Sequence, residues 1–240
     1  MNVIVVNNFN RMSEEAAKLL VAQVRTKPGS VLGLATGSTP LGVYKLLAEY
    51  HQAGVDFSRV ITFNLDEYIG LAPDHPQSYR YYMEENLFSK INIKQENTHV
   101  PSGIAPDLEA ECRRYEEAIR QAGGIDLQLL GIGSNGHIGF NEPGTPFDST
   151  TQIVDLTEST IRDNSRFFDS PDEVPTQAVS MGIKSIMQAK SIVLIASGGS
   201  KADAVCAAVH GPVTPEVPAS VLQLHPSVTI VVDQAAGGRL

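Results

Sequence analysis

Short apolar segments alternate with amphipathic ones along most of the chain. Residues 3–6 and 31–34 are rich in Val, Ile and Leu, as expected for strands that are buried on both faces. Between them, apolar residues recur at helical spacing from Met12 to Leu20, and Ser13 is a candidate cap for this predicted helix. The pattern therefore begins as strand, helix, strand.

The same alternation continues towards the carboxyl end. We expect further strands at residues 60–63, 125–130, 153–156, 191–196 and 228–232, and helices at residues 40–53, 78–88, 108–121 and 202–209. Repeated strand–helix units with apolar strands predict an α/β fold. The expected architecture is a mainly parallel, Rossmann-like sheet with helices on both faces. The sequence shows no internal repeat or linker, so we predict one domain over residues 1–240.

Composition and charge narrow the classes of partner. The 240 residues include 18 Lys and Arg against 27 Asp and Glu, a net charge of −9, which argues against a nucleic-acid partner. No apolar run approaches the ~20 residues that span a membrane, and the first residues lack the features of a signal peptide. Cys112 and Cys206 are too few for a disulfide framework or a cysteine zinc site, so we expect two buried thiols and a cytoplasmic location.

The segments that follow the predicted strands carry the candidate chemistry, because ligands of such sheets bind beyond the carboxyl ends of the strands. In the first segment, residues 35–40, Thr39 fits a helix N-cap, Pro40 fits the first helical position and Gly37 lets the backbone approach a ligand. Free N–H groups at such a helix start favour a phosphate. A capped turn without a ligand is the alternative.

The second segment contains two adjacent carboxylates, Asp66 and Glu67, at the end of a predicted strand. Adjacent side chains on a strand point apart, so one carboxylate can face the cleft while the other meets a structural partner. Partial desolvation would raise the pKa of the first and suit it to act as a general base. The alternative is a pair of loop carboxylates or helix caps.

The third segment, residues 131–143, is rich in glycine and contains His137 between Asn135 and Glu142. A histidine whose other ring nitrogen is held by an amide or carboxylate has a fixed tautomer and can shuttle a proton. A histidine packed for structural reasons is the alternative. The remaining histidines are scattered without the spacing of metal ligands, so we predict no metal site.

The fourth segment, residues 197–201, again places glycines at a predicted helix start and adds a cation, Lys201. Arg166 is a candidate for a bidentate phosphate contact. Taken singly, each of these cations is as compatible with a solvated surface charge.

Together these segments resemble the glucosamine-6-phosphate deaminase family. The resemblance extends over nearly the whole chain. It rests on Leu-Asp-Glu-Tyr at residues 65–68, Gly-His-Ile-Gly-Phe-Asn-Glu-Pro at 136–143, Asn-Ser-Arg-Phe-Phe at 164–168 and Leu-Gln-Leu-His-Pro at 222–226.

The resemblance implies an enzyme that converts glucosamine 6-phosphate and water to fructose 6-phosphate and ammonia, without a metal or an organic cofactor. It implies that Asp66 moves a proton from C2 to C1 and that His137 assists ring opening, held by Glu142 and Asn135. The residues implied to bind the phosphate are Gly37, Ser38, Thr39, Arg166 and Lys201.

The chain departs from longer members of the family in three ways. Asn135 stands where many members have Asp, and an amide cannot stabilise an imidazolium by charge. Some longer members are hexamers activated by N-acetylglucosamine 6-phosphate through basic residues, whereas residues 151–155 contain no Lys or Arg. The sequence also ends at Leu240 without their additional carboxyl-terminal segment. We expect an unregulated form, with a monomer plausible and an oligomer left open.

Two other functions remain open on the sequence alone. A 6-phosphogluconolactonase shares a similar Gly-His loop, but lactone hydrolysis needs no base at C2, so Asp66 and the Asn-Glu-Pro segment favour the deaminase. A non-catalytic sugar-phosphate sensor needs neither Asp66 nor His137. Release of ammonia from glucosamine 6-phosphate distinguishes all three.

Overall fold

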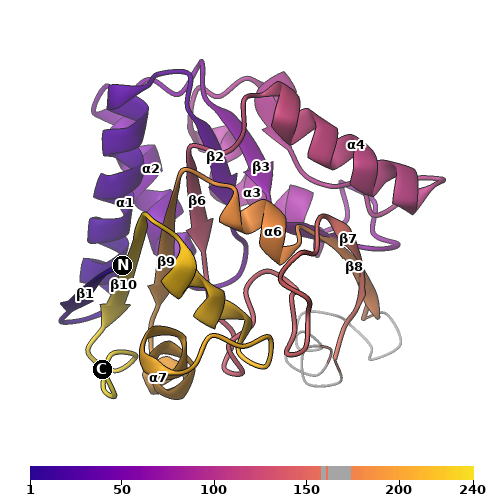
Figure 1. Ribbon diagram of the computed structural model, residues 1–240. Helices are drawn as coiled ribbons and strands as arrows, with labels where there is room; N and C mark the ends of the chain where they lie inside the picture. Colours follow the sequence, from indigo (N-terminus) through magenta and orange to yellow (C-terminus); the bar gives the residue numbers. More distant parts are fainter. Residues whose placement is uncertain (158–160, 162–173) are drawn as a thin grey trace.

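The computed structural model describes residues 1–157, 161 and 174–240. Its centre is a seven-stranded sheet in which neighbouring strands run parallel (Figure 1). In spatial order the strands are β1 (Asn2–Val6), β10 (Val228–Asp233), β9 (Ser191–Ala196), β6 (Leu127–Leu130), β2 (Val31–Leu34), β3 (Ile61–Asn64) and β5 (Thr98–His99). The predicted α/β class with a mainly parallel sheet is confirmed.

Helices cover both faces of this sheet, as predicted. One face carries α1 (Phe9–Thr26), α2 (Leu41–Gln52) and α3 (Tyr79–Asn86), and the other carries α4 (Leu108–Gln121), α6 (Ile183–Met187) and α7 (Ala202–His210). Short 3₁₀ helices cover Phe88–Lys90, Gln95–Asn97, Gly199–Lys201 and Pro218–Leu224. The sheet separates two hydrophobic cores, and successive side chains of a strand enter one core and then the other. On β9, Leu194 packs in one core and Ile195 in the other.

A second, three-stranded antiparallel sheet lies beside the first. It consists of β4 (Asp66–Tyr68), β8 (Gln177–Ser180) and β7 (Gln152–Asp155), with β8 in the middle. The sequence pattern predicted a strand close to β7 but neither β4 nor β8. Residues 66–68 are Asp-Glu-Tyr, so this strand has no alternation of apolar and polar positions that would reveal it.

The start of α1 differs from the prediction. Its N-cap is Asn8, whose side-chain oxygen accepts a hydrogen bond from the Arg11 amide at 3.0 Å. Ser13, the predicted cap, is buried inside the helix. Both residue types favour N-cap positions, but only Asn8 stands before the first helical turn.

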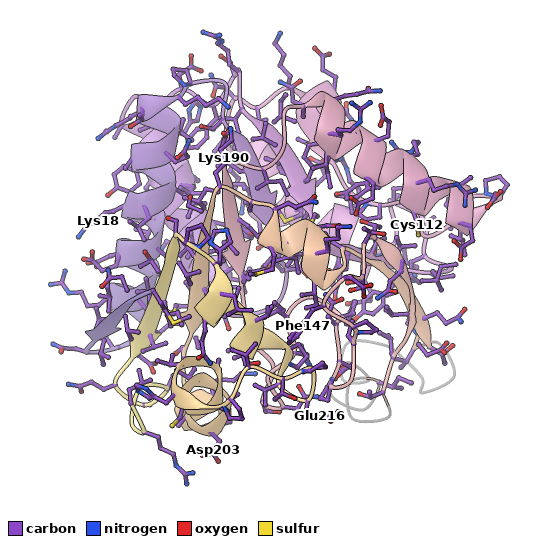
Figure 2. All side chains as sticks on the ribbon, in the orientation of Figure 1. Lys18, Cys112, Phe147, Lys190, Asp203 and Glu216 are labelled. Carbon is purple, nitrogen blue, oxygen red and sulfur yellow. The ribbon has the colours of Figure 1, made fainter. Side chains whose placement is uncertain are left out.

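The two cysteines differ in their surroundings. Both are free, and Cys112 on α4, labelled in Figure 2, is buried. Cys206 on α7 is partly exposed, so the prediction of a buried thiol is correct only for Cys112. Burial raises the pKa of the Cys112 thiol to about 11. This thiol is therefore protonated and a poor nucleophile at neutral pH.

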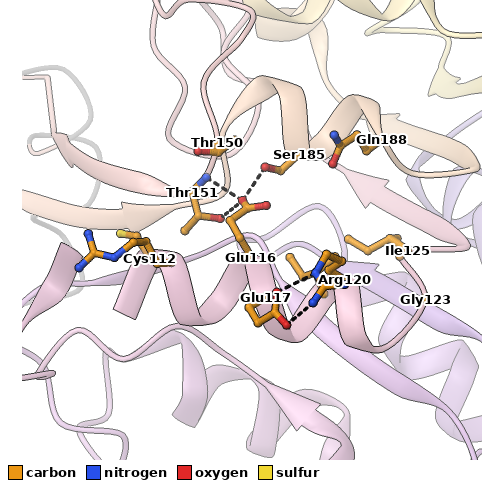
Figure 3. Close-up of a pocket in the computed structure, with 13 residues that line it drawn as sticks. Cys112, Glu116, Glu117, Arg120, Gly123, Ile125, Thr150, Thr151, Ser185 and Gln188 are labelled. Carbon is orange, nitrogen blue, oxygen red and sulfur yellow. Dashed lines mark hydrogen bonds and ion pairs between the residues drawn. The ribbon is translucent and has the colours of Figure 1, made fainter. Parts of the chain in front are cut away.

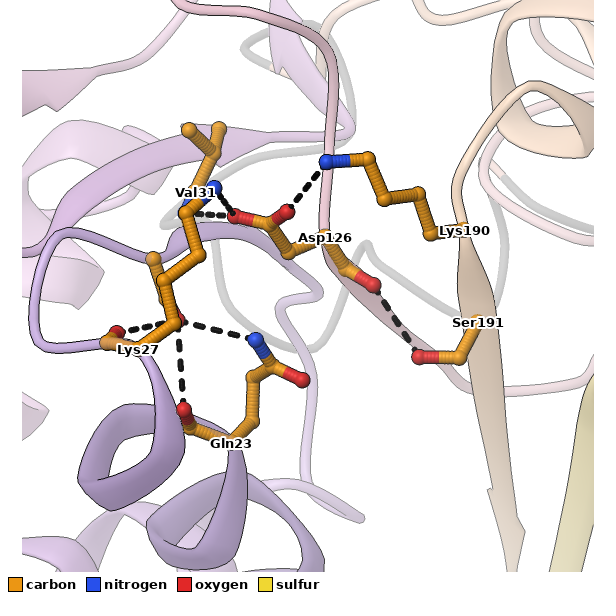
Figure 4. A network of polar contacts seen from close by, with 7 residues as sticks. Gln23, Lys27, Val31, Asp126, Lys190 and Ser191 are labelled. Atoms are coloured by element: carbon orange, nitrogen blue, oxygen red, sulfur yellow. Dashed lines mark hydrogen bonds and ion pairs between the residues drawn. The ribbon is translucent and has the colours of Figure 1, made fainter.

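A buried carboxylate joins three segments at the amino ends of the central strands. Asp126, which is 4% exposed, lies directly before β6 (Figure 4). Its Oδ2 accepts hydrogen bonds from the Val31 amide at 2.8 Å and from Lys27 Nζ at 2.6 Å, and its Oδ1 accepts one from Lys190 Nζ at 2.7 Å. Asp126 therefore holds the starts of β2, β6 and β9 together.

Burial by itself raises the pKa of Asp126, but Lys190, Lys27 and the Val31 amide outweigh it and leave the pKa below its usual range. A carboxyl group whose pKa is lower in the folded state stabilises the fold above its unfolded pKa. That stabilisation is lost as the pH falls through the folded pKa.

We expect Asp126→Ala to lower the free energy of unfolding by about 1–3 kcal/mol at pH 7, because it leaves a strand amide without its acceptor and removes two charged contacts. The loss should shrink below about pH 4, where the unfolded carboxyl is protonated. Urea unfolding at both pH values measures it. Asp203→Ala, which removes an exposed partner of Arg239, is the control, and equal effects of the two variants would contradict the assignment.

Candidate active site

A pocket of about 270 Å³ lies beyond the carboxyl ends of the central strands. It is lined by residues of the four segments singled out in the sequence, which follow β2, β3, β6 and β9: residues 35–40, 65–66, 131–134, 137, 139–140 and Lys201. These segments are far apart in the chain but meet here because parallel strands present their carboxyl ends at one edge of the sheet. Asp66 and His137 line the same pocket.

The loop of residues 35–40 ends at an open helix start. Helix α2 begins at Leu41, and its N-cap is Pro40, whose carbonyl accepts the Tyr44 amide at 3.0 Å. The prediction that Thr39 caps the helix and Pro40 is its first residue is therefore wrong. No side chain of the described residues caps α2, so its first amides stay available, and the positive end of the helix dipole favours an anion there.

Asp66 and Glu67 point in different directions, as expected for neighbours on a strand. Asp66 is 5% exposed and lines the pocket, and the described residues donate no hydrogen bond to its carboxyl group. Glu67 lies away from the pocket and accepts hydrogen bonds from three backbone amides, those of Tyr68, Tyr79 and Arg80, each at 2.9 Å. Glu67 therefore caps the start of α3, and Asp66 is the carboxylate left to meet a ligand.

Burial changes the proton affinity of both carboxyl groups. Burial and, to a smaller extent, the negative charge of Glu67 together raise the pKa of Asp66 to about 8. Burial also raises the pKa of Glu67, against the opposing effect of its three amide donors. A carboxylate with such a pKa binds a proton more strongly than an exposed one, which is the property required of a general base that acts near neutral pH.

His137 lies beside Glu142 and Asn135. Glu142 Oε2 is 3.4 Å from His137 Nδ1 and accepts a hydrogen bond from the Asn135 side-chain amide at 2.7 Å. The Asn135 side-chain oxygen accepts the His137 backbone amide at 3.2 Å. His137 Nδ1 is buried and lacks an aligned hydrogen bond within the described residues, so Glu142 acts on it as a nearby charge. The structure thus brings His137, Glu142 and Asn135 together.

Two aromatic side chains also line the pocket: Phe140, from the third segment, and Tyr79, which the sequence did not single out. The Tyr79 and Phe140 rings are stacked, with centroids 6.1 Å apart and planes 16° from parallel, and the Tyr79 hydroxyl donates to the Tyr68 hydroxyl at 3.1 Å. Tyr79 is the first residue of α3, so its place depends on Glu67. Ser78 caps α3, and its side-chain oxygen accepts the Tyr81 amide. A serine at the start of the helix expected at residues 78–88 is the signal in the sequence that could have placed Tyr79.

Of the two cations predicted to bind the phosphate, the structure describes only Lys201. Lys201 lines the pocket at the end of a 3₁₀ helix that leads into α7. The loop before it is held by Asp233 at the end of β10, which accepts hydrogen bonds from Ser197 Oγ and the Gly198 amide. Arg166 lies outside the described residues.

A larger pocket, of about 820 Å³, lies between α4, the segment of residues 150–151 and α6 (Figure 3). Its central carboxylate, Glu116, accepts hydrogen bonds on Oε1 from the Thr151 amide, Thr151 Oγ1 and Ser185 Oγ. Glu117 and Arg120 on its rim pair with each other. Glu116 thus ties α4 to Thr151 and to Ser185 of α6, and none of the predicted site residues lines this pocket.

Comparison with known proteins gives the family. A model described as glucosamine-6-phosphate isomerases/6-phosphogluconolactonase matches residues 7–231. The chain belongs to this family. It is 60% identical over 237 residues to the glucosamine-6-phosphate deaminase of Thermoanaerobacter pseudethanolicus, a match that covers 98% of this chain and 94% of that protein.

Solved structures of the glucosamine-6-phosphate isomerase/6-phosphogluconolactonase family agree. A monomeric glucosamine-6-phosphate deaminase matches with a TM-score of 0.98 and 46% identity over 100% of both chains. The 6-phosphogluconolactonase of Trypanosoma brucei matches with a TM-score of 0.79 and 19% identity, over 100% of this chain and 98% of that one, which shows a shared fold only.

The described residues contain neither a membrane-spanning helix nor a cluster of metal-ligating side chains. None of their helices has the length and apolar character needed to cross a membrane. They contain no cluster of three His, Cys, Asp or Glu side chains that could hold a metal ion.

We expect Asp66→Asn to raise the melting temperature of the protein at pH 8 by several degrees. A carboxyl group whose pKa is raised on folding destabilises the fold increasingly as the pH rises from its unfolded pKa, about 4, towards its folded pKa, about 8. In a protein of this size, each kcal/mol shifts Tm by about 2–4 °C. Calorimetry at pH 4 and pH 8 tests this, and an advantage of the variant that does not grow with pH would contradict the burial argument.

Proposed function

We infer that the chain catalyses the isomerisation and deamination of glucosamine 6-phosphate to fructose 6-phosphate and ammonia. Relatives that are 54–61% identical over nearly the whole chain carry the name of this activity. The observation that carries the inference is the pocket itself, where the Asp66 carboxylate, without a hydrogen-bond donor among the described residues, lies in one cavity with His137 and an open helix start.

The anchoring of the substrate comes first in the proposed mechanism. The phosphate binds the loop of Gly37, Ser38 and Thr39 at the start of α2, and Lys201 contributes a positive charge from the opposite segment. Arg166 belongs to the proposed phosphate site on the family resemblance alone. The phosphate contacts hold the sugar in the pocket, with the reacting carbons at its other end, and they are made alike in the ground state and the transition state.

Proton transfers follow at the other end of the sugar. His137 moves the proton of the ring oxygen as the ring opens, and the Glu142 carboxylate lies 3.4 Å from its Nδ1. Asp66 then removes the proton from C2 and returns it to C1 through an enol-type intermediate. Water replaces the amine at C2, and ammonia leaves. Asn135 positions Glu142 and the His137 backbone, so it acts through them.

The same residues argue against the two alternative functions, a lactone hydrolase and a sugar-phosphate sensor. A lactone hydrolase has no need for a buried base beside C2, and the structural likeness to 6-phosphogluconolactonases is a likeness of fold. A protein that only binds a sugar phosphate has no use for a buried Asp66, because burying this carboxyl group lowers the stability of the fold. We further propose that the enzyme acts in the cytoplasm as a monomer, in line with the monomeric deaminase that it resembles, and without a metal or an organic cofactor.

We expect the purified protein to release ammonia from glucosamine 6-phosphate, and Asp66→Asn to lower kcat by about 10²–10⁴-fold, because one general base typically contributes that much. A coupled ammonia assay at saturating substrate measures both. Asp74→Asn, on an exposed carboxylate outside the pocket, should keep wild-type kcat. An Asp66→Asn variant with nearly normal kcat would show that another group is the base.

We also expect hyperbolic kinetics that N-acetylglucosamine 6-phosphate does not activate. The segment whose counterpart binds this activator in some longer relatives is Thr-Gln-Ile-Val-Asp here, largely strand β7, and it carries no cation for a phosphate. Initial rates over a wide range of substrate, with and without millimolar activator, provide the test. Sigmoidal rates that the N-acetyl sugar phosphate converts to hyperbolic ones would refute it.

A further inference from the structure

Tyr82 reaches from α3 to the loop of residues 35–40. Its hydroxyl donates a hydrogen bond to the Gly37 carbonyl at 2.6 Å, across 45 positions of the sequence. Tyr82 itself does not line the active-site pocket. It lines a neighbouring hollow of about 280 Å³ between this loop and α3, and Gly37 and Ser38 line both cavities. The peptide that joins Gly37 to Ser38 is therefore a wall between the two.

The hydrogen bond from Tyr82 sets the orientation of the whole peptide between Gly37 and Ser38. In a planar trans peptide the C=O and the following N–H point in opposite directions, and the described residues contain no cis peptide bond. A Gly37 carbonyl that is held towards Tyr82 turns the Ser38 N–H towards the other cavity, which is the active-site pocket. The backbone of Gly37 has φ of +103°, a conformation that glycine adopts without strain.

A second tyrosine holds the same loop two residues earlier. The hydroxyl of Tyr44, on α2, donates to the Ala35 carbonyl, and Tyr44 is fully buried. The rings of Tyr44 and Tyr82 meet edge to face, with centroids 6.4 Å apart and planes at 70°. Two hydroxyls from two helices thus fix two alternate carbonyls of the loop.

We propose that Tyr82 is a positioning residue for the phosphoryl group of the substrate. It aims the Ser38 amide into the pocket by holding the Gly37 carbonyl, and it touches neither the phosphate nor the reacting carbons. This proposal rests on the phosphate site of the proposed function. Because the phosphate is bound equally in the ground state and the transition state, loss of the contact changes KM and leaves kcat unaffected.

The test replaces Tyr82 with Phe, which keeps the ring packed against Tyr44 and removes only the hydroxyl. We expect Kd for inorganic phosphate, measured by calorimetry, to rise roughly 2- to 10-fold, the range that one net hydrogen bond supports. KM for glucosamine 6-phosphate should rise by the same factor at unchanged kcat. Tyr81→Phe is the matched control, because Tyr81 is the next residue of α3 and makes no side-chain hydrogen bond within the described part of the chain.

Unchanged phosphate affinity in Tyr82→Phe, or a fall in kcat at constant KM, would overturn the proposal. A second measurement needs no variant: phosphate should shift the Ser38 amide resonance of the wild-type protein, and an unmoved resonance would equally refute it. Both phosphate titrations are independent of turnover. Failure of the deaminase assay with intact phosphate effects would therefore count against the proposed function and leave the role of Tyr82 standing.

Discussion

Three backbone N–H groups bind the Glu67 carboxylate, and the rest of the site depends on that interaction. Because neighbouring side chains of a strand face opposite ways, the anchoring of Glu67 turns Asp66 into the pocket. Two of the donors are the first amides of α3, so the same contact sets where this helix begins. Helix α3 in turn places Tyr79 in the pocket and Tyr82 against the loop of residues 35–40. One carboxylate thus organises the proposed base, an aromatic wall and the loop geometry.

The groups at the proposed phosphate site are positive, whereas the molecule as a whole carries a negative net charge. A net charge of −9 disfavours an anionic substrate at long range, but salt screens such a diffuse field beyond about 8–10 Å. In the phosphate site that we propose, the open amides of α2 and the Lys201 ammonium act at contact distance and outweigh this field. Asp66 is an unfavourable element of the same pocket. Its buried environment disfavours the ionised carboxylate, which is the form that acts as a base. The fold maintains this destabilising arrangement through stabilisation elsewhere, in the two cores and at Asp126.

The sequence predicts the class of fold and the four segments of the pocket well, because buried parallel strands and glycine-rich loops have strong local patterns. It does not reveal β4 and β8, whose residues show no periodicity, or the roles of Tyr79 and Tyr82, which come from contacts distant in sequence. The error at Thr39 has a similar origin, since cap preference is local but the first helical bond here starts at Pro40. The single domain of residues 1–240 and the contribution of Arg166 stay predictions.

The pocket draws its two halves from different sheets. Asp66 pairs with Ser180 in the antiparallel sheet, and Ser180 Oγ accepts the Phe140 amide, so the loop of His137 is bound to the same sheet. The loop of Gly37 and the segment of Lys201 follow β2 and β9 of the parallel sheet. A sugar phosphate that spans the pocket consequently connects the two sheets a second time, in addition to the Leu65 backbone, which bonds to Leu34 and to Met181. Ligand occupancy should stiffen the molecule as a whole, with the gain greatest along the seam where the sheets meet.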